Sequence, residues 1–341
     1  MATLVRPKID LEVAKKVVFD LYGLNVTRIT ALNGYDDKNF HILVAKNIDC
    51  DGYVLKVVNN LDSLDEKAFH AQTELLVYLN NSDIRCSKPF PTKNGKPFEI
   101  ISLPSGKHVV RLLEYIAGDI LFQIKNPKNY IFFQVGVLAA KMDNALQKFD
   151  HPAYHKTIPW CLSSAPDILN YLHSVNEKQQ VLVKQTINEF SSRVLINEDK
   201  LDKGIIHGDI NEQNLIVETE NEKTKVTSVI DFGDTHYCCY LYELALAMMY
   251  MIVLANDIEA GGHVLAGYLS VRPMREEDIN LLKICVMARF CQSLVLGAHA
   301  SLQDPGNDYV LITAKKGWGL LKQLAEESEA EVLRKWKNIY S

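Results

Sequence analysis

The sequence lacks the features that define membrane-spanning, disulfide-bonded and zinc-binding proteins. Its longest uncharged stretch, 244–256, is well short of the roughly 20 residues that a membrane-spanning helix needs, so it predicts a buried helix instead. The seven cysteines are an odd number and include no CxxC pair, which indicates neither a disulfide framework nor a zinc site. We therefore expect reduced thiols in the core of the protein.

The sequence also has no large excess of positive or of negative residues. Lys plus Arg number 37 against 42 for Asp plus Glu, a net charge of −5, which argues against a protein that coats nucleic acid or a membrane surface. The N-terminal segment MATLVRPKID reaches charge and proline too early for the apolar core of a signal peptide, so we expect a cytoplasmic protein. At about 150 residues per domain, 341 residues predict two domains or lobes.

The pattern of apolar residues changes character near residue 116. Before it, the spacing predicts a helix, three strands, a second helix that begins with a capping box at Ser63–Glu66, and two more strands, over 10–22, 28–32, 39–44, 53–58, 62–80, 98–103 and 109–115. After it, helices dominate, over 130–149, 166–171, 178–195, 240–255, 276–300 and 308–324. We therefore expect an N-terminal lobe, 1–115, and a larger C-terminal lobe, 116–341.

One β-type segment interrupts the helical half. Residues 214–219 and 225–231 have the pattern of a hairpin about the polar turn 220–224. Folding the hairpin about the middle of this turn places Asn214 opposite Asp231, with both side chains at the same end. An amide oxygen beside a carboxylate is a set of hard ligands that suits Mg²⁺ bound mainly through waters and phosphates. The hairpin therefore predicts that Asn214 and Asp231 bind magnesium.

Asp209 lies just upstream of this hairpin, in the segment HGDINEQN that ends at Asn214. The intervening loop is short enough to bring its carboxylate near a molecule that is bound to the metal. Phosphoryl transfer needs such an arrangement, because metal ions neutralise the phosphates while a separate carboxylate orients the attacking hydroxyl and accepts its proton. We therefore expect Asp209 to be a general base.

HGDINEQN followed by VIDFGD resembles the catalytic and metal loops of the aminoglycoside phosphotransferase and choline kinase branch of the protein-kinase-like fold. The resemblance implies an α+β, two-lobed fold, with a small antiparallel-sheet lobe for the nucleotide and a mainly helical lobe for catalysis and substrate. It makes Asp209 the base, Asn214 and Asp231 the Mg²⁺ ligands, and His207 a scaffold residue. Gly208 replaces the Arg that meets an activation-loop phosphate in many protein kinases, so we expect no regulation by loop phosphorylation.

The resemblance also points to donor-binding residues in the N-terminal lobe. YVLK ends the third strand as VAIK does in kinases, so Lys56 is similar to the lysine that contacts the α- and β-phosphates. Glu74 on the following helix is its expected ion-pair partner, and Glu66 is the second candidate.

The phosphate-covering turn, 32–40, departs from the kinase pattern GxGxxGxV, because it holds a single glycine. Asn39 and Lys38 are its candidates for phosphate binding, whereas Asp36 and Asp37 would repel a triphosphate unless they turn away. The segment EYIA resembles the hinge whose backbone groups bind a purine, so Glu114 and Ile116 are expected to contact the nucleotide.

A more extended resemblance, from about residue 26 to the C-terminus, is to the hydroxylysine kinase family. It rests on the segments YDDKNFH (35–41), VRLLEY (110–115), DFGD (231–234), GGHVLAGY (261–268) and RFCQSLV (289–295). The resemblance implies Mg²⁺-dependent transfer of the γ-phosphoryl group of GTP, or of ATP, to the side-chain hydroxyl of free 5-hydroxy-L-lysine, a step of lysine degradation.

Such a substrate brings two ammonium groups and one carboxylate, which a desolvated pocket must match with opposite charges. The candidates are Asp234, Glu212 and Glu243 for the ammonium groups and Arg289 for the carboxylate, with His263 and Arg272 as further cations. Structural interpretations compete with this: Glu243 is equally well explained by the dipole of the helix that follows, whereas for Arg289 and His263 burial in the core or at its rim is the favoured explanation.

Two other functions stay open at this point. One is a related kinase of choline, ethanolamine, an aminoglycoside or a sugar-like alcohol that uses ATP. The other is a catalytically silent nucleotide-binding module, whose mark would be the loss of the base or of a metal ligand. Asp209, Asn214 and Asp231 are all present, so the sequence favours an enzyme.

Overall fold

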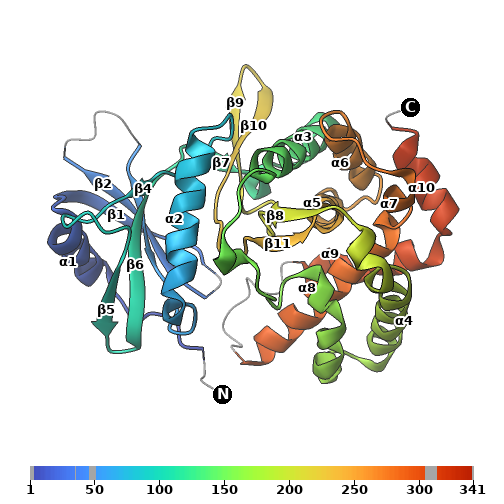
Figure 1. Ribbon diagram of the computed structural model, residues 1–341, viewed down its shortest axis with the longest axis horizontal. Helices are drawn as coiled ribbons and strands as arrows, with labels where there is room; N and C mark the ends of the chain where they lie inside the picture. Colours follow the sequence, from blue (N-terminus) through green and yellow to red (C-terminus); the bar gives the residue numbers. More distant parts are fainter. Residues whose placement is uncertain (1–3, 35, 46–50, 304–312, 340–341) are drawn as a thin grey trace. The chain divides into compact units, whose positions relative to one another are not determined.

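The computed structural model describes residues 4–34, 36–45, 51–303 and 313–339, which fall into two units, Met1–Ala117 and Gly118–Ser341 (Figure 1). The sequence analysis places its boundary between Tyr115 and Ile116. Tyr35 and the first part of the helix predicted over 308–324 lie outside the described residues.

The first unit is built on an antiparallel sheet with the strand order β1-β2-β3-β6-β4, in which β5 also pairs with β6 (Figure 1). Its strands are β1 (Val26–Leu32), β2 (Lys38–Val44), β3 (Tyr53–Val57), β4 (Pro89–Phe90), β5 (Glu99–Leu103) and β6 (Gly106–Glu114), and its helices are α1 (Leu11–Tyr22) and α2 (Glu66–Asn80). This is the meander, helix and strand pair that the sequence predicts.

The two helices contact opposite faces of this sheet. Alternate residues of β2, β3 and β6 form one core cluster with α1, whose buried members are Ala14, Val18, Tyr22, Phe40, Ile42, Leu55, Val57, Val110 and Leu112. Phe69 of α2 packs with Val58, Phe98 and Val109 instead. Because neighbouring strand residues point to opposite faces, Val109 and Val110 contribute to different clusters.

The start of α2 differs from the prediction. Asp65, not Ser63, is the N-cap, and its carboxylate accepts a hydrogen bond from the Ala68 N–H at 3.2 Å. The Ser63 hydroxyl instead donates to the Asn59 carbonyl at 2.6 Å and accepts from the Val109 N–H at 2.8 Å. The predicted capping box is therefore wrong, because Ser63 is part of a short 3-10 helix, Asp62–Leu64, that precedes α2.

The second unit is mainly helical and holds two small sheets, ordered β10-β9-β7 and β11-β8. The strands are β7 (Asp119–Ile120), β8 (Lys203–Ile206), β9 (Leu215–Glu220), β10 (Lys223–Val229) and β11 (His236–Cys239). The helices are α3 (Asn129–Leu146), α4 (Glu177–Arg193), α5 (Tyr240–Ala255), α6 (Ala260–Leu269), α7 (Glu276–Ile279), α8 (Leu282–Gln303), α9 (Ala314–Glu326) and α10 (Glu329–Lys337). An antiparallel-sheet unit followed by a helical one confirms the α+β fold class.

The sequence prediction is incomplete in this unit. The helix expected over 276–300 is divided into α7 and α8, and the short helix over 166–171 is part of a longer 3-10 helix, Leu162–Ser174. The helices α6 and α10 and the short strands β4, β7, β8 and β11 were not predicted. The segment Glu276–Gln303 is long and apolar enough to cross a membrane, but 83% of its apolar window is buried inside the protein, as expected of a core helix.

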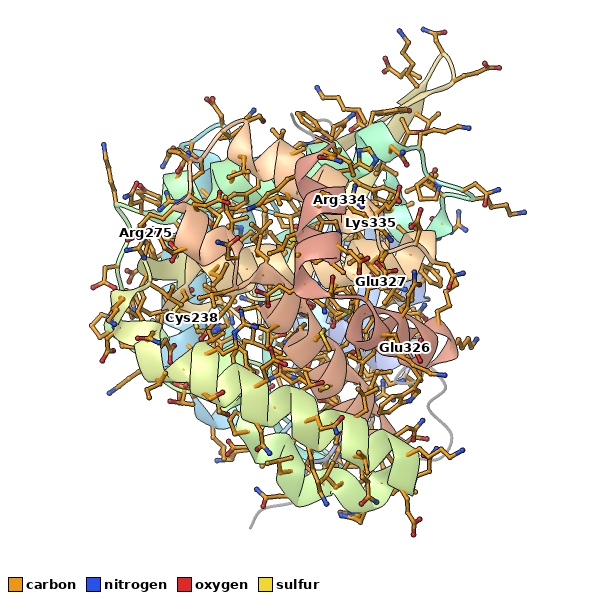
Figure 2. The ribbon with its side chains drawn as sticks, turned by 90° about the vertical axis from the view of Figure 1, so that its right-hand side faces the viewer. Cys238, Arg275, Glu326, Glu327, Arg334 and Lys335 are labelled. Atoms are coloured by element: carbon orange, nitrogen blue, oxygen red, sulfur yellow. The ribbon has the colours of Figure 1, made fainter. Side chains whose placement is uncertain are left out.

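α8 is held near its start by the junction between the last two helices. The Lys283 Nζ donates to the Glu327 carbonyl at 2.6 Å, and the Lys335 Nζ donates to the Glu327 carboxylate at 2.7 Å. Figure 2 shows Glu327 and Lys335 beside each other at this junction. α10 then begins with a capping box formed by Ser328 and Glu331. These contacts fix the helix that carries Arg289.

α3 and α6 pack closely because each presents a glycine to the other. A Cβ added to Gly136 would collide with the Val264 carbonyl oxygen, and one added to Gly267 would collide with the Phe133 carbonyl oxygen. Backbone atoms cannot move aside as the end of a flexible side chain can, so the close approach of the two helices depends on these glycines.

We expect Gly136→Ala to destabilise the protein by about 1–3 kcal/mol, because the added methyl group overpacks the α3–α6 contact. Gly319→Ala is the matched control: it also lies in a helix, α9, but has no atom within 4 Å of the added Cβ. This control should gain about 0.5–1 kcal/mol, since Ala is the better helix former. Thermal and denaturant unfolding test this, and equal melting temperatures of the two variants would contradict it.

Candidate active site

The hairpin of β9 and β10 turns more tightly than the sequence predicts. Its turn holds only Asn221 and Glu222, both with positive φ (48° and 62°), as required by the tight turns that match strand twist. The strands pair Glu220 with Lys223 near the turn and Leu215 with Val229 at the base, with an irregularity at Thr227. The predicted turn at 220–224 is therefore wrong.

The tighter turn changes the pairing at the base of the hairpin. The Asn214 carbonyl accepts a hydrogen bond from the Ile230 N–H at 2.9 Å, so Asn214 faces Ile230 and not Asp231. Asp231 follows one residue later in a left-handed conformation, with φ of 64°. Both residues still leave the same end of the hairpin, one residue out of the predicted register.

β8 leads into the loop that holds Asp209, and His207 anchors the start of this loop. The imidazole is fully buried, and burial lowers its pKa to about 4, so it is neutral. Its Nδ1 accepts from the Asp209 N–H at 3.2 Å, so Nε2 carries the proton and donates to the Ile230 carbonyl at 3.2 Å. His207 thus ties the loop to the base of the hairpin, as a scaffold residue would.

Glu243, in the first turn of α5, is the second anchor. Its carboxylate is fully buried and accepts hydrogen bonds from two successive backbone N–H groups, those of His207 at 2.8 Å and Gly208 at 3.0 Å. Burial raises its pKa to about 7, and the two N–H groups act in the opposite direction. The expectation that Glu243 receives a substrate ammonium group is not favoured by this geometry, because both carboxylate oxygens bind the loop backbone.

Asp209 is oriented from two sides. The Asn214 Nδ2 donates to the Asp209 carboxylate at 2.7 Å and to the Asp209 carbonyl at 3.0 Å. On the other side, the Arg289 guanidinium lies 4.0 Å from the second carboxylate oxygen. Burial raises the pKa of Asp209, and the guanidinium opposes this shift. The side chain keeps 22% of its surface exposed, so it is held in place yet accessible.

Asn214 and Asp231 offer the oxygen atoms that the sequence predicts for a metal. Because the Asn214 Nδ2 faces two acceptors on Asp209, its Oδ1 points away from them. Asp231 is exposed, and its carboxylate raises the pKa of both His207 and Asp209, so its charge lies near the loop. The chemistry of this donor set, one amide oxygen and one carboxylate, fits a hard divalent cation.

Arg289 was expected to bind a substrate carboxylate, but the structure places it in the interior. Only 2% of its surface is exposed, it donates to the Trp160 carbonyl at 2.7 Å and the Gln292 amide oxygen at 2.8 Å, and it stacks near the rings of Trp160 and Tyr250. These contacts favour its role as a charge partner of Asp209. No sequence pattern predicts this pairing, because α8 and the loop are far apart along the chain.

Among the other substrate candidates, Glu212 has the most telling surroundings. It is 4% exposed, and its Oε2 has no hydrogen-bond partner within the described residues. Burial raises its pKa to about 7, and the Asp209 charge acts in the same direction. Asp234 is half-exposed, and its backbone carbonyl packs over Gly208. Arg272 donates to the Asn144 amide oxygen at 2.7 Å and stacks on Tyr240.

In the first unit, the structure gathers the donor-binding candidates of β2 and β3. Lys56 faces Asn39 across the two strands and lies 3.9 Å from the Asp37 carboxylate. Asp37 also accepts from the Asn59 N–H at 2.9 Å. The Asn39 Nδ2 donates to the Asn33 carbonyl at 3.3 Å, and its buried Oδ1 has no hydrogen-bond partner within the described part of the chain. Asp37 therefore turns toward Lys56, a pairing that the sequence analysis did not foresee.

For three further candidates in this unit, the interactions expected from the sequence remain predictions. Glu74 is exposed on α2, and its pairing with Lys56 is a prediction. Glu114 ends β6, where its N–H donates to the Lys88 carbonyl at 2.7 Å, and Ile116 is 6% exposed. Their contacts with a nucleotide are predictions as well.

Comparison with known proteins shows the family of the chain. The sequence matches the phosphotransferase enzyme family over residues 28–278. It is 34% identical to a hydroxylysine kinase of Xenopus laevis, covering 97% of this chain and 94% of that protein. A hydroxylysine kinase of Bos taurus is 32% identical, with 98% and 94% covered.

Solved structures show the same fold at low sequence identity. A microcompartment-associated aminopropanol kinase has a TM-score of 0.75 at 18% identity, covering 96% of this chain and all of that one (100%). The amicoumacin kinase hAmiN has a TM-score of 0.70 at 15% identity, with 95% and 97% covered. The protein therefore belongs to the phosphotransferase enzyme family, with hydroxylysine kinases among its relatives, and is a kinase that phosphorylates an alcohol group.

Proposed function

We propose that the protein transfers the γ-phosphoryl group of GTP, or of ATP, to the side-chain hydroxyl of 5-hydroxy-L-lysine. The observation that carries the proposal is the hydrogen bond of 2.7 Å from the Asn214 Nδ2 to the Asp209 carboxylate. This bond leaves the Asn214 Oδ1 free for a metal. The acceptor is inferred from the 34% identity to a hydroxylysine kinase over nearly the full length.

Asp209 is proposed as the general base. Its Oδ2 is held by Asn214 and its Oδ1 faces Arg289, so the carboxylate has a fixed direction and an opposite charge beside it. In the reaction, the substrate oxygen forms a bond to the γ-phosphorus while the bond to the β–γ bridging oxygen breaks. The nucleoside diphosphate leaves with that electron pair, and the hydroxyl proton passes to Asp209.

Asn214 and Asp231 are proposed to hold Mg²⁺, which when bound neutralises charge on the transferring phosphates. Lys56, Asn39 and the hinge backbone at Glu114 and Ile116 are proposed to bind the nucleotide. Support comes from solved structures of the same fold: one is the amicoumacin kinase hAmiN in complex with AMP-PNP and Ca²⁺, and another is a GDP complex of an aminoglycoside 2′-phosphotransferase. We place the reaction in the cytoplasm, as the sequence analysis expects.

Glu212 is proposed to receive an ammonium group of the acceptor. A buried carboxylate oxygen without a hydrogen-bond partner is costly, and an ammonium group removes that cost. Glu212 also interacts electrostatically with Asp209, so the ammonium group that it binds belongs to a molecule near the base. Asp234 is the proposed second acceptor of positive charge.

A turnover panel tests the acceptor and the donor. Hydroxylysine, choline, ethanolamine, an aminoglycoside and a sugar alcohol are each offered with GTP and with ATP, and formation of the nucleoside diphosphate is measured. We expect hydroxylysine with GTP to give the highest kcat/KM. Turnover of another alcohol but not of hydroxylysine would favour a related kinase, and nucleotide binding without turnover of any acceptor would favour a silent module.

Asp209→Asn and Asp231→Asn separate the base from the metal ligand. We expect Asp209→Asn to lower kcat by about 10²–10⁴-fold with the KM for Mg²⁺-nucleotide nearly unchanged, because only proton transfer is lost. Asp231→Asn should also weaken Mg²⁺-nucleotide binding by at least about tenfold, since even an outer-shell change costs that much. Steady-state kinetics and nucleotide titration measure both. Equal and mild effects of the two substitutions would refute the division of roles.

Glu212→Gln tests recognition of the ammonium group. Loss of the negative charge should raise the KM for hydroxylysine by about tenfold or more and leave the KM for nucleotide unchanged, since a charged hydrogen bond contributes about 1.5–3 kcal/mol. Glu218→Gln, on the nearby strand β9, is the matched control and should keep both constants. An unchanged KM for hydroxylysine in Glu212→Gln would remove Glu212 from the acceptor site.

A further inference from the structure

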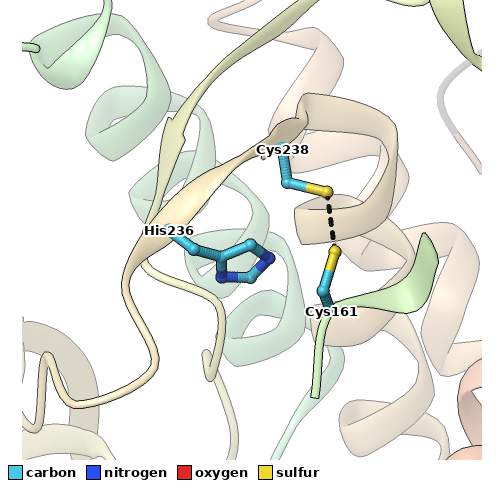
Figure 3. A group of neighbouring side chains, drawn as sticks. All are labelled: Cys161, His236 and Cys238. Carbon is cyan, nitrogen blue, oxygen red and sulfur yellow. Dashed lines mark hydrogen bonds between the residues drawn. The ribbon is translucent and has the colours of Figure 1, made fainter. Parts of the chain in front are cut away.

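Two cysteines and a histidine that have no part in the phosphoryl-transfer site lie together in the second unit. The Cys161 and Cys238 sulfur atoms are 3.2 Å apart, although the two residues are distant in the sequence. His236 lies two positions before Cys238 on β11, so both side chains project from the same face of the strand. One ligand atom from each of the three residues lies within 4.8 Å of the others, and all three side chains are buried (Figure 3).

His236 is oriented as a metal-binding histidine is. Its Nδ1 donates to the Asp234 backbone carbonyl at 2.7 Å, which fixes the tautomer and leaves the lone pair on Nε2. Figure 3 shows the imidazole directed toward the two sulfur atoms. Only 2% of the residue is exposed, and Nε2 has no hydrogen-bond partner within the described residues. The Cys161 thiol lies near enough to interact with this acceptor, so the lone pair is directed at the sulfur atoms with which it would share a cation.

The donor set selects the kind of cation. Thiolates and imidazole suit Zn²⁺, whereas Mg²⁺ prefers oxygen ligands. Without a cation, Cys161 and Cys238 are free cysteines. On binding Zn²⁺, the two thiols release their protons to solvent, and the two thiolates cancel the charge of the ion. A neutral buried site avoids the cost of a buried charge.

A route to the site exists in the structure. A cavity of about 250 Å³ is lined by Cys161 and Cys238, together with Ser163, Glu198 and Lys203. Two thiolates and one imidazole with a water in the fourth position are a known coordination set of zinc. The cavity provides space for that water, and Glu198 is among its polar lining residues.

We propose that Cys161, Cys238 and the Nε2 of His236 bind one Zn²⁺ ion, with water as the fourth ligand. The proposal is independent of the acceptor and donor of the phosphoryl transfer. A second cavity of about 10 Å³, lined by His236, Arg289 and Tyr242, offers the rival explanation that a buried water satisfies Nε2. A zinc ion would convert the two thiols to thiolates, whereas a buried water would not, so a metal titration distinguishes the two explanations.

The site would act on the loop of Asp209 through β11. His236 pairs with Ile206, the last residue of β8, and the loop begins directly after it. The His236 ring also packs against Gly208, since a Cβ there would lie 3.1 Å from its Cε1. A zinc ion that ties β11 to Cys161 would therefore restrain the strand behind the loop and raise the melting temperature as the free Zn²⁺ concentration exceeds its dissociation constant.

The test uses the full chain, reduced, stripped of metal with a chelator and kept under nitrogen. It is titrated with Zn²⁺ and, separately, with Co²⁺, in excess Mg²⁺ so that the oxygen site is occupied. We expect one tightly bound Zn²⁺ per chain, a higher melting temperature with zinc, and a Co²⁺ complex that shows thiolate-to-cobalt charge transfer and the intense visible bands of a tetrahedral site. The cobalt spectrum of the wild-type protein requires no variant to fold.

Cys161→Ser, Cys238→Ser and His236→Gln should each lower the zinc affinity at least about tenfold, and the cysteine variants should lose most of the charge-transfer band. Cys285→Ala, a buried cysteine of α8 outside the cluster, is the matched control and should keep both. The proposal is overturned if the reduced wild-type protein takes up no zinc, if cobalt binds without thiolate charge transfer, or if air oxidation forms a Cys161–Cys238 disulfide in a protein that binds no zinc when reduced.

Discussion

The candidate active site depends on one buried carboxylate. Glu243 accepts hydrogen bonds from the successive N–H groups of His207 and Gly208, and a side chain with only one acceptor atom at this point would leave an N–H group unsatisfied in the interior. Because these N–H groups belong to the first two residues of the loop, their position determines where the Asp209 side chain points. Through Glu243, the position of α5 in the core determines the position of Asp209. A rigid support of this kind is what an accurately placed base needs.

The hairpin supplies the second constraint, since Asn214 serves two neighbours with one amide. Its NH₂ group holds Asp209, the proposed base, and its oxygen is left for the proposed cation, so the two proposed roles are linked through one planar group. The opposite charge of Arg289 then offsets part of the cost of burying Asp209. In this way the hairpin, through Asn214, binds one oxygen of the Asp209 carboxylate, and the distant helix α8, through Arg289, faces the other.

The sequence analysis predicted the features that follow from local or periodic patterns, and it missed those that depend on long-range packing. The α5 helix, the strand meander and the Asp209–Asn214–Asp231 set follow from periodicity and spacing, and their elements are present. The predicted hairpin register is off by one residue, because the hydrophobic pattern shows neither the tight turn at Asn221 and Glu222 nor the irregularity at Thr227, which offsets part of that shift. The partners of Arg289 and the pairing of Cys161 with Cys238 arise between segments far apart in the chain, where spacing carries no information. Short strands such as β8 and β11 lack enough residues to show a period.

The left-handed backbone at Asp231 bears on how proteins of this kind lose activity. Few residues with a side chain accept a φ of 64°, and Asp and Asn are the ones that do so most readily. Exchange of one for the other is therefore tolerated by the main chain while it removes the negative charge. If Asp231 binds the metal as proposed, its exchange for Asn would give an inactive but well-folded protein, so selection at this position would act on chemistry alone.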